Sequence, residues 1–164
     1  MYGVNPIQNL TELSHELTYH RYILNQGQAD TLFQAISIPE YIALHHVIHS
    51  INEKGDGDKT YLRDIADELK LSIPQASKMV GNLRDKGLVS WSHDGNGSEG
   101  TYITITDSGL RLMDRQEAIL QDYYGRVTEK FGRENMAELL RLMIRLEQVM
   151  DAELAEKGDK ADGV

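Results

Sequence analysis

The sequence has no cysteine, and only three prolines, two phenylalanines and one tryptophan among its 164 residues. Without cysteine, disulfide bonds, thiolate zinc sites and cysteine nucleophiles are excluded. No apolar run approaches the roughly 20 residues that a membrane-spanning helix needs. The first six residues also lack the basic stretch followed by an apolar stretch that marks a signal peptide. We therefore expect a soluble, cytoplasmic protein with no membrane partner.

The motifs of common enzyme classes are missing as well. The sequence contains no Gly-x-Ser-x-Gly nucleophile motif, no Walker phosphate loop and no His-Glu-x-x-His metal motif. Carboxylates and histidines are present, but no spacing brings them together as a catalytic group. We therefore expect no enzymatic activity and no cofactor.

Positive charge is scarce, and it is concentrated in one segment. The whole chain has 17 Lys and Arg against 26 Asp and Glu, a net charge of −9. Residues 59–93 carry six basic and four acidic side chains, a net charge of +2, whereas residues 1–58 and 94–164 have net charges of −5 and −6. A basic segment in an acidic chain is consistent with a local nucleic-acid contact. The acidic remainder would repel phosphates presented in any other orientation.

Three helix starts share one sequence signal. Asn5, Ser37 and Ser72 each stand three residues before Gln or Glu, with a proline in between. This spacing is typical of a capping box with proline in the first turn. The apolar residues that follow predict helices over residues 6–25, from Ser37 to a glycine-rich loop near position 55, and over residues 73–86.

Residues 60–106 have the pattern of a winged helix-turn-helix. A short predicted helix over 61–69 precedes the third capped helix, which ends at Gly87 in the position that favours a left-handed residue. β-forming runs over residues 88–93 and 101–106 flank a glycine-rich turn, so they predict a hairpin. The predicted fold is mainly α-helical with a small β-hairpin. Such a unit presents its second helix to the major groove of DNA.

Apolar faces outside the winged unit predict a homodimer. Residues 1–36 supply an N-terminal dimerisation helix and a connector, residues 37–106 form the DNA-binding lobe, and residues 107–156 form C-terminal dimerisation helices that end near Ala155. Residues 157–164 are small and polar, and we expect a flexible tail. A two-fold dimer would offer its recognition helices to successive major grooves, roughly 34–36 Å apart, of a pseudo-palindromic operator in double-stranded DNA. Packing within the monomer alone is the alternative.

The capped helix over residues 73–86 has two faces. Its apolar face, which includes Ile73 and Val80, is expected to pack on the preceding helix. Its polar face includes Gln75, which can make a bidentate pair with adenine, and Lys78, which can reach guanine acceptors or a phosphate. The full set expected to contact DNA is Arg63, Ser72, Pro74, Gln75, Ser77, Lys78, Asn82 and Arg84. The alternative is a solvated polar face with no ligand.

A set of residues between 62 and 109 carries a family resemblance. It consists of Leu62, Ile65, Ala66, Leu69, Leu71, Ser72, Val80, Leu83, Lys86, Gly87, Leu88, Val89, Asp94, Ile105, Thr106 and Gly109. These residues resemble the MarR family of bacterial transcriptional regulators, and the order of helices is similar over nearly the whole chain. The resemblance implies a homodimeric repressor or activator whose outer helices form the dimer interface. It also implies a small-molecule effector that changes the spacing of the recognition helices.

The wing departs from that family's pattern. Family members commonly carry an arginine at the wing tip that enters the minor groove. This sequence has Gly97, Ser98 and Glu99 there, and no arginine in the wing. Because a glutamate is repelled by phosphate, we expect the wing to add little to DNA binding.

Three further hypotheses concern ligands and partners. His45 and His49 stand four residues apart on one predicted helix, close enough to share a metal ion, so a metal-sensing regulator is one alternative. Tyr19 and Tyr22, together with these histidines, are candidates for lining an effector pocket. A winged-helix module that binds a protein rather than DNA is another alternative, favoured by the acidic net charge and the arginine-free wing.

Overall fold

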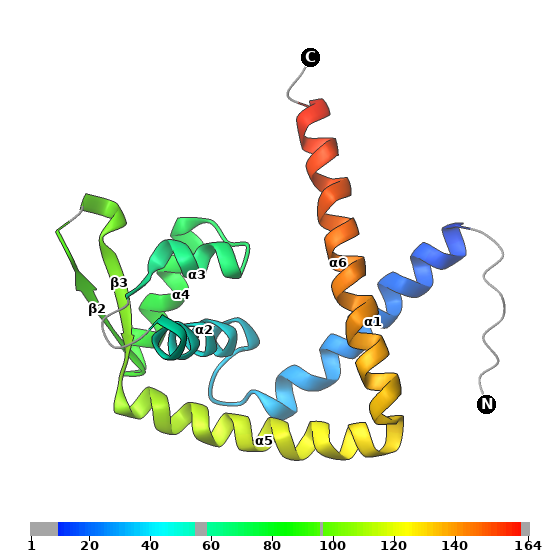
Figure 1. Cartoon of the computed structure of the whole chain (residues 1–164), viewed down its shortest axis with the longest axis horizontal. Helices are drawn as coiled ribbons and strands as arrows, with labels where there is room; N and C mark the ends of the chain where they lie inside the picture. The colour runs from blue at the N-terminus through cyan, green and yellow to red at the C-terminus, as the bar shows by residue number, and fades with distance from the viewer. Residues whose placement is uncertain (1–9, 55–58, 96, 162–164) are drawn as a thin grey trace. The chain divides into compact units, whose positions relative to one another are not determined.

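The computed structural model describes residues 10–54, 59–95 and 97–161. The helices are α1 (Leu10–Leu32), α2 (Ile38–Lys54), α3 (Leu62–Glu68), α4 (Ile73–Asp85), α5 (Asp107–Phe131) and α6 (Arg133–Ala161) (Figure 1). The strands are β1 (Thr60–Tyr61), β2 (Val89–His93) and β3 (Thr101–Ile105). A 3₁₀ turn, η1 (Gly97–Glu99), lies between β2 and β3 at the wing tip. This composition confirms a mainly helical fold with a small sheet. The chain divides into two units, residues 1–119 and 120–164.

The three strands form an antiparallel sheet in the order β1-β3-β2. β2 and β3 pair along their whole length, starting with Val89 opposite Ile105, which confirms the predicted hairpin. β1 adds a third strand, with Thr60 opposite Ile103. No sequence pattern predicts this strand, because two residues are too few to show an alternation of apolar and polar side chains.

The core of the first unit joins α2, α3, α4, the sheet and the start of α5. Ala76, Val80 and Leu83 of α4 are buried, as the helical periodicity predicts. Ile73 is 48% exposed, so the prediction that it packs on α3 was wrong: it begins the helix, ahead of the buried stripe that starts at Ala76. The main cluster of buried residues consists of Ile36, Ala43, Leu44, Val47, Ile65, Val80, Leu83, Leu88, Val89, Ile103 and Met113.

Two of the three predicted capping boxes lie in the described residues, and both form. Ser37 N–H donates to Glu40 Oε2 at 2.8 Å, and Ser37 Oγ accepts the Glu40 N–H at 3.3 Å. Ser72 and Gln75 make the same pair of bonds at the start of α4. The box predicted at Asn5 lies outside the described residues. Local sequence therefore determines where α2 and α4 begin.

Two helix ends lie beyond their predicted positions. α1 continues to Leu32 and α6 continues to Ala161. Residues 157–161, predicted to belong to a flexible tail, are therefore helical, and residues 162–164 lie outside the described part of the chain. Neither extension contains a proline, and the single glycine in each lowers helix stability by only about 1 kcal/mol.

The start of α5 is held against the start of β2 by a close backbone contact. A Cβ added to Gly109 would lie 2.2 Å from Leu88 O and 2.7 Å from Ile105 Cγ1. Thr106 completes the junction, because its N–H donates to Leu88 O at 3.0 Å and its hydroxyl donates to Gly87 O at 2.7 Å. Only glycine therefore fits at position 109 without a shift of the backbone.

We predict that Gly109→Ala lowers the free energy of unfolding by roughly 1–3 kcal/mol, because the added methyl group has no room in a packed junction. The control is Gly81→Ala on α4, where an added Cβ meets nothing within 4 Å. There the free energy of unfolding should rise by up to about 1 kcal/mol through helix propensity. Chemical denaturation followed by circular dichroism measures both. A Gly109→Ala protein as stable as the wild type would contradict the clash.

Candidate nucleic-acid interface

The capping box at the start of α4 decides how Gln75 is presented. The backbone N–H of Gln75 donates to Ser72 Oγ at 3.3 Å, and the side-chain Oε1 of Gln75 accepts the Ser72 N–H at 2.9 Å. The side-chain carbonyl is therefore engaged in the helix cap, and the Nε2 amide group is left to face a ligand. The predicted pairing with adenine needs both atoms. In this arrangement Gln75 acts as a hydrogen-bond donor.

The predicted contact residues within α4 are not equally accessible. Pro74, Gln75, Lys78 and Asn82 are exposed, whereas Ser77 is half-buried. The polar face is therefore narrower than the sequence suggests. It is centred on side chains that are three or four residues apart, as neighbours on one helix face are.

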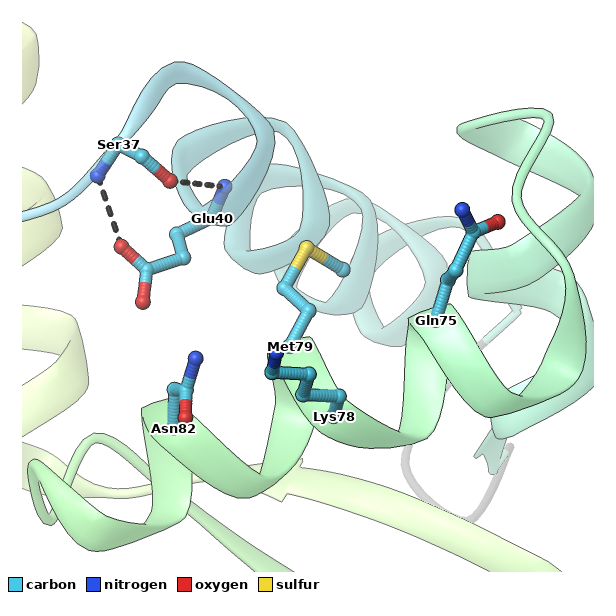
Figure 2. A pocket seen from close by; sticks show the side chains of 6 residues that line it. All are labelled: Ser37, Glu40, Gln75, Lys78, Met79 and Asn82. Atoms are coloured by element: carbon cyan, nitrogen blue, oxygen red, sulfur yellow. Dashed lines mark hydrogen bonds between the residues drawn. The ribbon is translucent and has the colours of Figure 1, made fainter.

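An open groove of about 340 Å³ lies between the first turn of α2 and the polar face of α4 (Figure 2). It is lined by Ser37, Glu40, Gln75, Lys78, Met79 and Asn82. Three of these residues, Gln75, Lys78 and Asn82, belong to the set predicted to contact DNA. The structure therefore brings them together along one edge, with Met79 as the apolar member of the lining.

A buried carboxylate ties the two walls of this groove together. Glu40 is 6% exposed, and its oxygens lie 2.9 and 3.0 Å from Nζ of Lys86, the residue that caps the end of α4. Burial by itself raises the pKa of Glu40. The hydrogen bond from the Ser37 amide and the charge of Lys86 more than offset burial, so the pKa of Glu40 lies below its ordinary value. An ionised carboxylate thus joins the start of α2 to the end of α4.

Several solved structures share this architecture, and they are transcriptional regulators. The chain is similar to MepR of S. aureus in complex with DNA, with 19% identity and a TM-score of 0.67 over 84% of this chain and 97% of that one. It is similar to a mutant of MarR from E. coli complexed with operator DNA, with 16% identity and a TM-score of 0.68 over 84% and 98% of the two chains. The chain has the fold of MarR.

PcaV of Streptomyces coelicolor, solved in complex with its natural ligand, has the same MarR fold. Its identity to this chain is 17%, and the TM-score is 0.64 over 90% of this chain and 98% of that one. No protein-family model matches the sequence, and no curated protein matches it significantly. The similarity confirms, at the level of the fold, the MarR-family resemblance seen in the sequence. In the described part of the chain, no helix has the length and apolar character to cross a membrane.

Basic side chains in the helix-turn-helix of this MarR fold are mostly paired within the chain. Arg63 Nη1 lies 3.2 Å from Glu99 Oε1, and Arg84 Nη2 lies 3.0 Å from Asp85 Oδ1. Of the six basic residues between positions 59 and 93, only Lys78 has no ion pair, hydrogen bond or ring contact with another described residue. Lys78 is therefore the basic group of this segment most available to a ligand.

The wing is fastened to β1 and to the start of α3. Tyr61 O–H donates to Asp94 Oδ2 at 2.8 Å, and the Tyr61 and Tyr102 rings meet edge to face with centroids 6.3 Å apart. Lys59 Nζ lies 4.5 Å from the centre of the Tyr102 ring. Sequence reasoning missed the contact between Tyr61 and Asp94, because nothing local in the sequence links residues that are 33 positions apart.

A second groove, of about 270 Å³, lies between the end of α1 and the first half of α5. It is lined by Thr31, Leu32, Gln34, Ala35, Leu112, Arg115, Gln116 and Ile119. Gln116 is 4% exposed, and its Nε2 donates to Leu32 O at 2.7 Å, so it is committed to holding α5 against α1. Arg115 is the charged member of the lining. An apolar groove with one arginine suits a small molecule that carries an acid group.

The residues predicted for an effector or metal site line neither of these grooves. His45 and His49 lie on α2 with their rings edge to face and centroids 5.2 Å apart. Tyr19 and Tyr22 are exposed on α1. Within the described residues, no three His, Cys, Asp or Glu side chains converge closely enough to hold a metal ion. The assignment of these four residues to an effector pocket stays a prediction.

We predict that Glu40→Gln lowers the free energy of unfolding at neutral pH by roughly 1–3 kcal/mol, because the Ser37 amide and Lys86 lose a charged acceptor. The pKa of Glu40 is lower in the folded state than in the unfolded state. Its stabilising contribution is therefore present above the unfolded pKa and is lost as the pH falls through the folded pKa.

The difference in stability between wild type and Glu40→Gln should consequently shrink as the pH falls below the ordinary range of a carboxyl group and through the lower folded-state pKa of Glu40. Urea denaturation at a series of pH values measures it, with the exposed Glu156→Gln as the control for loss of one carboxylate. A difference that stays constant over this range would contradict the assigned pKa shift.

Proposed function

We propose that the protein is a homodimeric, sequence-specific DNA-binding regulator of transcription that reads its operator through α4. The observation that carries the proposal is the exposed cluster of Gln75, Lys78 and Asn82 on a capped helix whose other face is buried. A helix of this kind is what a helix-turn-helix inserts into the major groove. MepR and MarR, which share the fold, are both described in complexes with DNA.

Exposed apolar side chains on α6 support the dimer. Nine of its large hydrophobic residues are 40–68% exposed in the single chain: Leu139, Leu140, Leu142, Met143, Ile144, Leu146, Val149, Met150 and Leu154. A large exposed apolar patch marks an interaction surface. We infer that a second copy covers this surface, and we keep the assignment of residues 1–36 and 107–156 to dimerisation as part of the proposal.

An effector is proposed for the groove between α1 and α5. PcaV was solved with its natural ligand, and Arg115 offers this chain a charge for an acid group in an otherwise largely apolar lining. We propose that a small organic acid binds there and weakens the operator complex. Repression in the cytoplasm is the proposed mode of action, since a bound dimer excludes other proteins from the DNA it covers.

A module that binds another protein rather than DNA is the second candidate. The observation in its favour is that Arg63, Arg84 and Lys86 are each paired with an acidic side chain, which lowers the positive potential of the helix-turn-helix. Such a module would retain no duplex even at low salt. The metal-sensing alternative has no comparable support, because His45 and His49 lack a third ligand among the described residues.

We predict that Lys78→Ala weakens binding to a labelled duplex of about 30 bp, long enough for two successive major grooves, and lowers the salt slope by about 2, because each protomer of the dimer loses one phosphate contact. The physical reason is that Lys78 is available to neutralise a phosphate and release its counterion. Lys157→Ala removes the same charge near the end of α6 and should leave affinity and slope unchanged. Fluorescence anisotropy over a series of NaCl concentrations measures both quantities.

Gln75 needs a variant that keeps the helix cap. Gln75→Glu preserves an acceptor for the Ser72 N–H but replaces the outward amide with a carboxylate oxygen. It should unfold like the wild type and bind the duplex roughly tenfold or more weakly. If neither this variant nor Lys78→Ala weakened binding, the role of α4 would be refuted. A wild-type protein that binds no duplex at low salt would contradict the proposed function and favour the protein-binding module.

A further inference from the structure

The wing tip carries an acidic side chain that forms an ion pair with a basic side chain of the helix-turn-helix. Glu99 ends the 3₁₀ turn η1, and its Oε1 lies 3.2 Å from Nη1 of Arg63, the second residue of α3. The two residues are 36 positions apart in the sequence. Arg63 was predicted to contact DNA, yet in the structure its charge is compensated by the wing.

Contacts at the base of the wing keep this pair within reach. The hydrogen bond from Tyr61 to Asp94 and the edge-to-face contact of Tyr61 with Tyr102 join β1, which leads directly into α3, to the start of the hairpin turn and to β3. Within the turn, the Asp94 N–H donates to Gly100 O at 3.0 Å. The position of Glu99 opposite Arg63 is therefore built into the hairpin rather than left to one surface contact.

The pair itself is weak enough to exchange. The side chains of Arg63 and Glu99 are 66% and 73% exposed. Pairs this exposed are well hydrated and screened by salt, so a competing anion can displace one partner at little cost. A DNA phosphate is such an anion, because arginine binds phosphate and carboxylate oxygens with the same donor geometry. While the pair persists, however, Arg63 adds no net charge to the DNA-facing surface.

We propose that Glu99 limits the affinity of the protein for DNA by holding Arg63 in a pair that a backbone phosphate must displace. The inference rests on the proposed DNA-binding function. After displacement, the carboxylate of Glu99 stays near the phosphate that replaced it and repels it. Glu99 therefore opposes binding twice, first because the pair with Arg63 must be broken and then because two negative charges lie close together. A glutamate at the wing tip thus acts opposite to an arginine that would reach for the minor groove.

The test compares wild type, Glu99→Gln, Arg63→Ala and the double variant on the same labelled duplex over a series of NaCl concentrations. Glu99→Gln keeps an oxygen that accepts from Arg63 but removes the charge, so the wing geometry is preserved. It should bind DNA roughly threefold to tenfold more tightly at low salt and raise the salt slope by about 1.8, the value for one added phosphate contact in each of the two protomers. Asp159→Asn, which makes the same change in net charge near the end of α6 and beyond the dimerisation segment, should change neither quantity.

The double variant tests whether Arg63 carries the effect. In the Arg63→Ala background, Glu99→Gln should produce little or none of the gain seen in the wild-type background. A full gain in that background would show that Glu99 acts by repulsion alone and would overturn the role of the pair. Unchanged or weaker binding by Glu99→Gln, with the wild type still binding, would also overturn it. Failure of every protein to bind the duplex would instead refute the proposed DNA-binding function.

Discussion

The position of α4 depends on one buried carboxylate. Glu40 receives the Ser37 N–H at the start of α2 and holds Lys86 at the end of α4. The Glu40 carboxylate is buried but the Lys86 side chain is 42% exposed, so desolvation and solvent screening offset most of the attraction. Removal of the carboxylate leaves the Ser37 amide and Lys86 without their acceptor. The pair therefore acts mainly on geometry. It fixes the distance between α2 and α4, and with it the groove along which Gln75 and Lys78 are exposed.

Local pairing limits the positive charge that this chain, with a net charge of −9, presents around α4. Glu40 and Asp85 compensate basic groups near the end of α4, and Glu99 compensates Arg63 from the wing. In the part of the chain that the structure describes, the basic side chain of α4 that is left without an ion pair is Lys78, which lies beside a few uncharged donors. We expect such a surface to bind nonspecific DNA weakly, because the sequence-independent part of binding comes mainly from phosphate neutralisation. Discrimination then rests on base-edge contacts made by a rigidly held helix.

Features encoded within a few residues could be predicted from the sequence, and features made by distant residues could not. The capping boxes at Ser37 and Ser72 depend on side chains three positions apart, and both form as predicted. β1 and the pairing of Arg63 with Glu99 depend on the tertiary fold, and no local pattern announces them. Gln75 lies between these cases. The sequence predicts that its side chain caps α4 and also that it contacts DNA bases, and only the structure shows that the cap engages the side-chain carbonyl.

The most direct test of the account is selection of bound duplexes from a random-sequence pool with the full-length protein. The account predicts enrichment of an inverted repeat whose half-sites are centred about 10 bp apart or a multiple of that spacing, as expected for a two-fold dimer that places α4 in successive major grooves. Recovery of no enriched sequence, with the protein folded throughout, would contradict the central claim that α4 reads DNA.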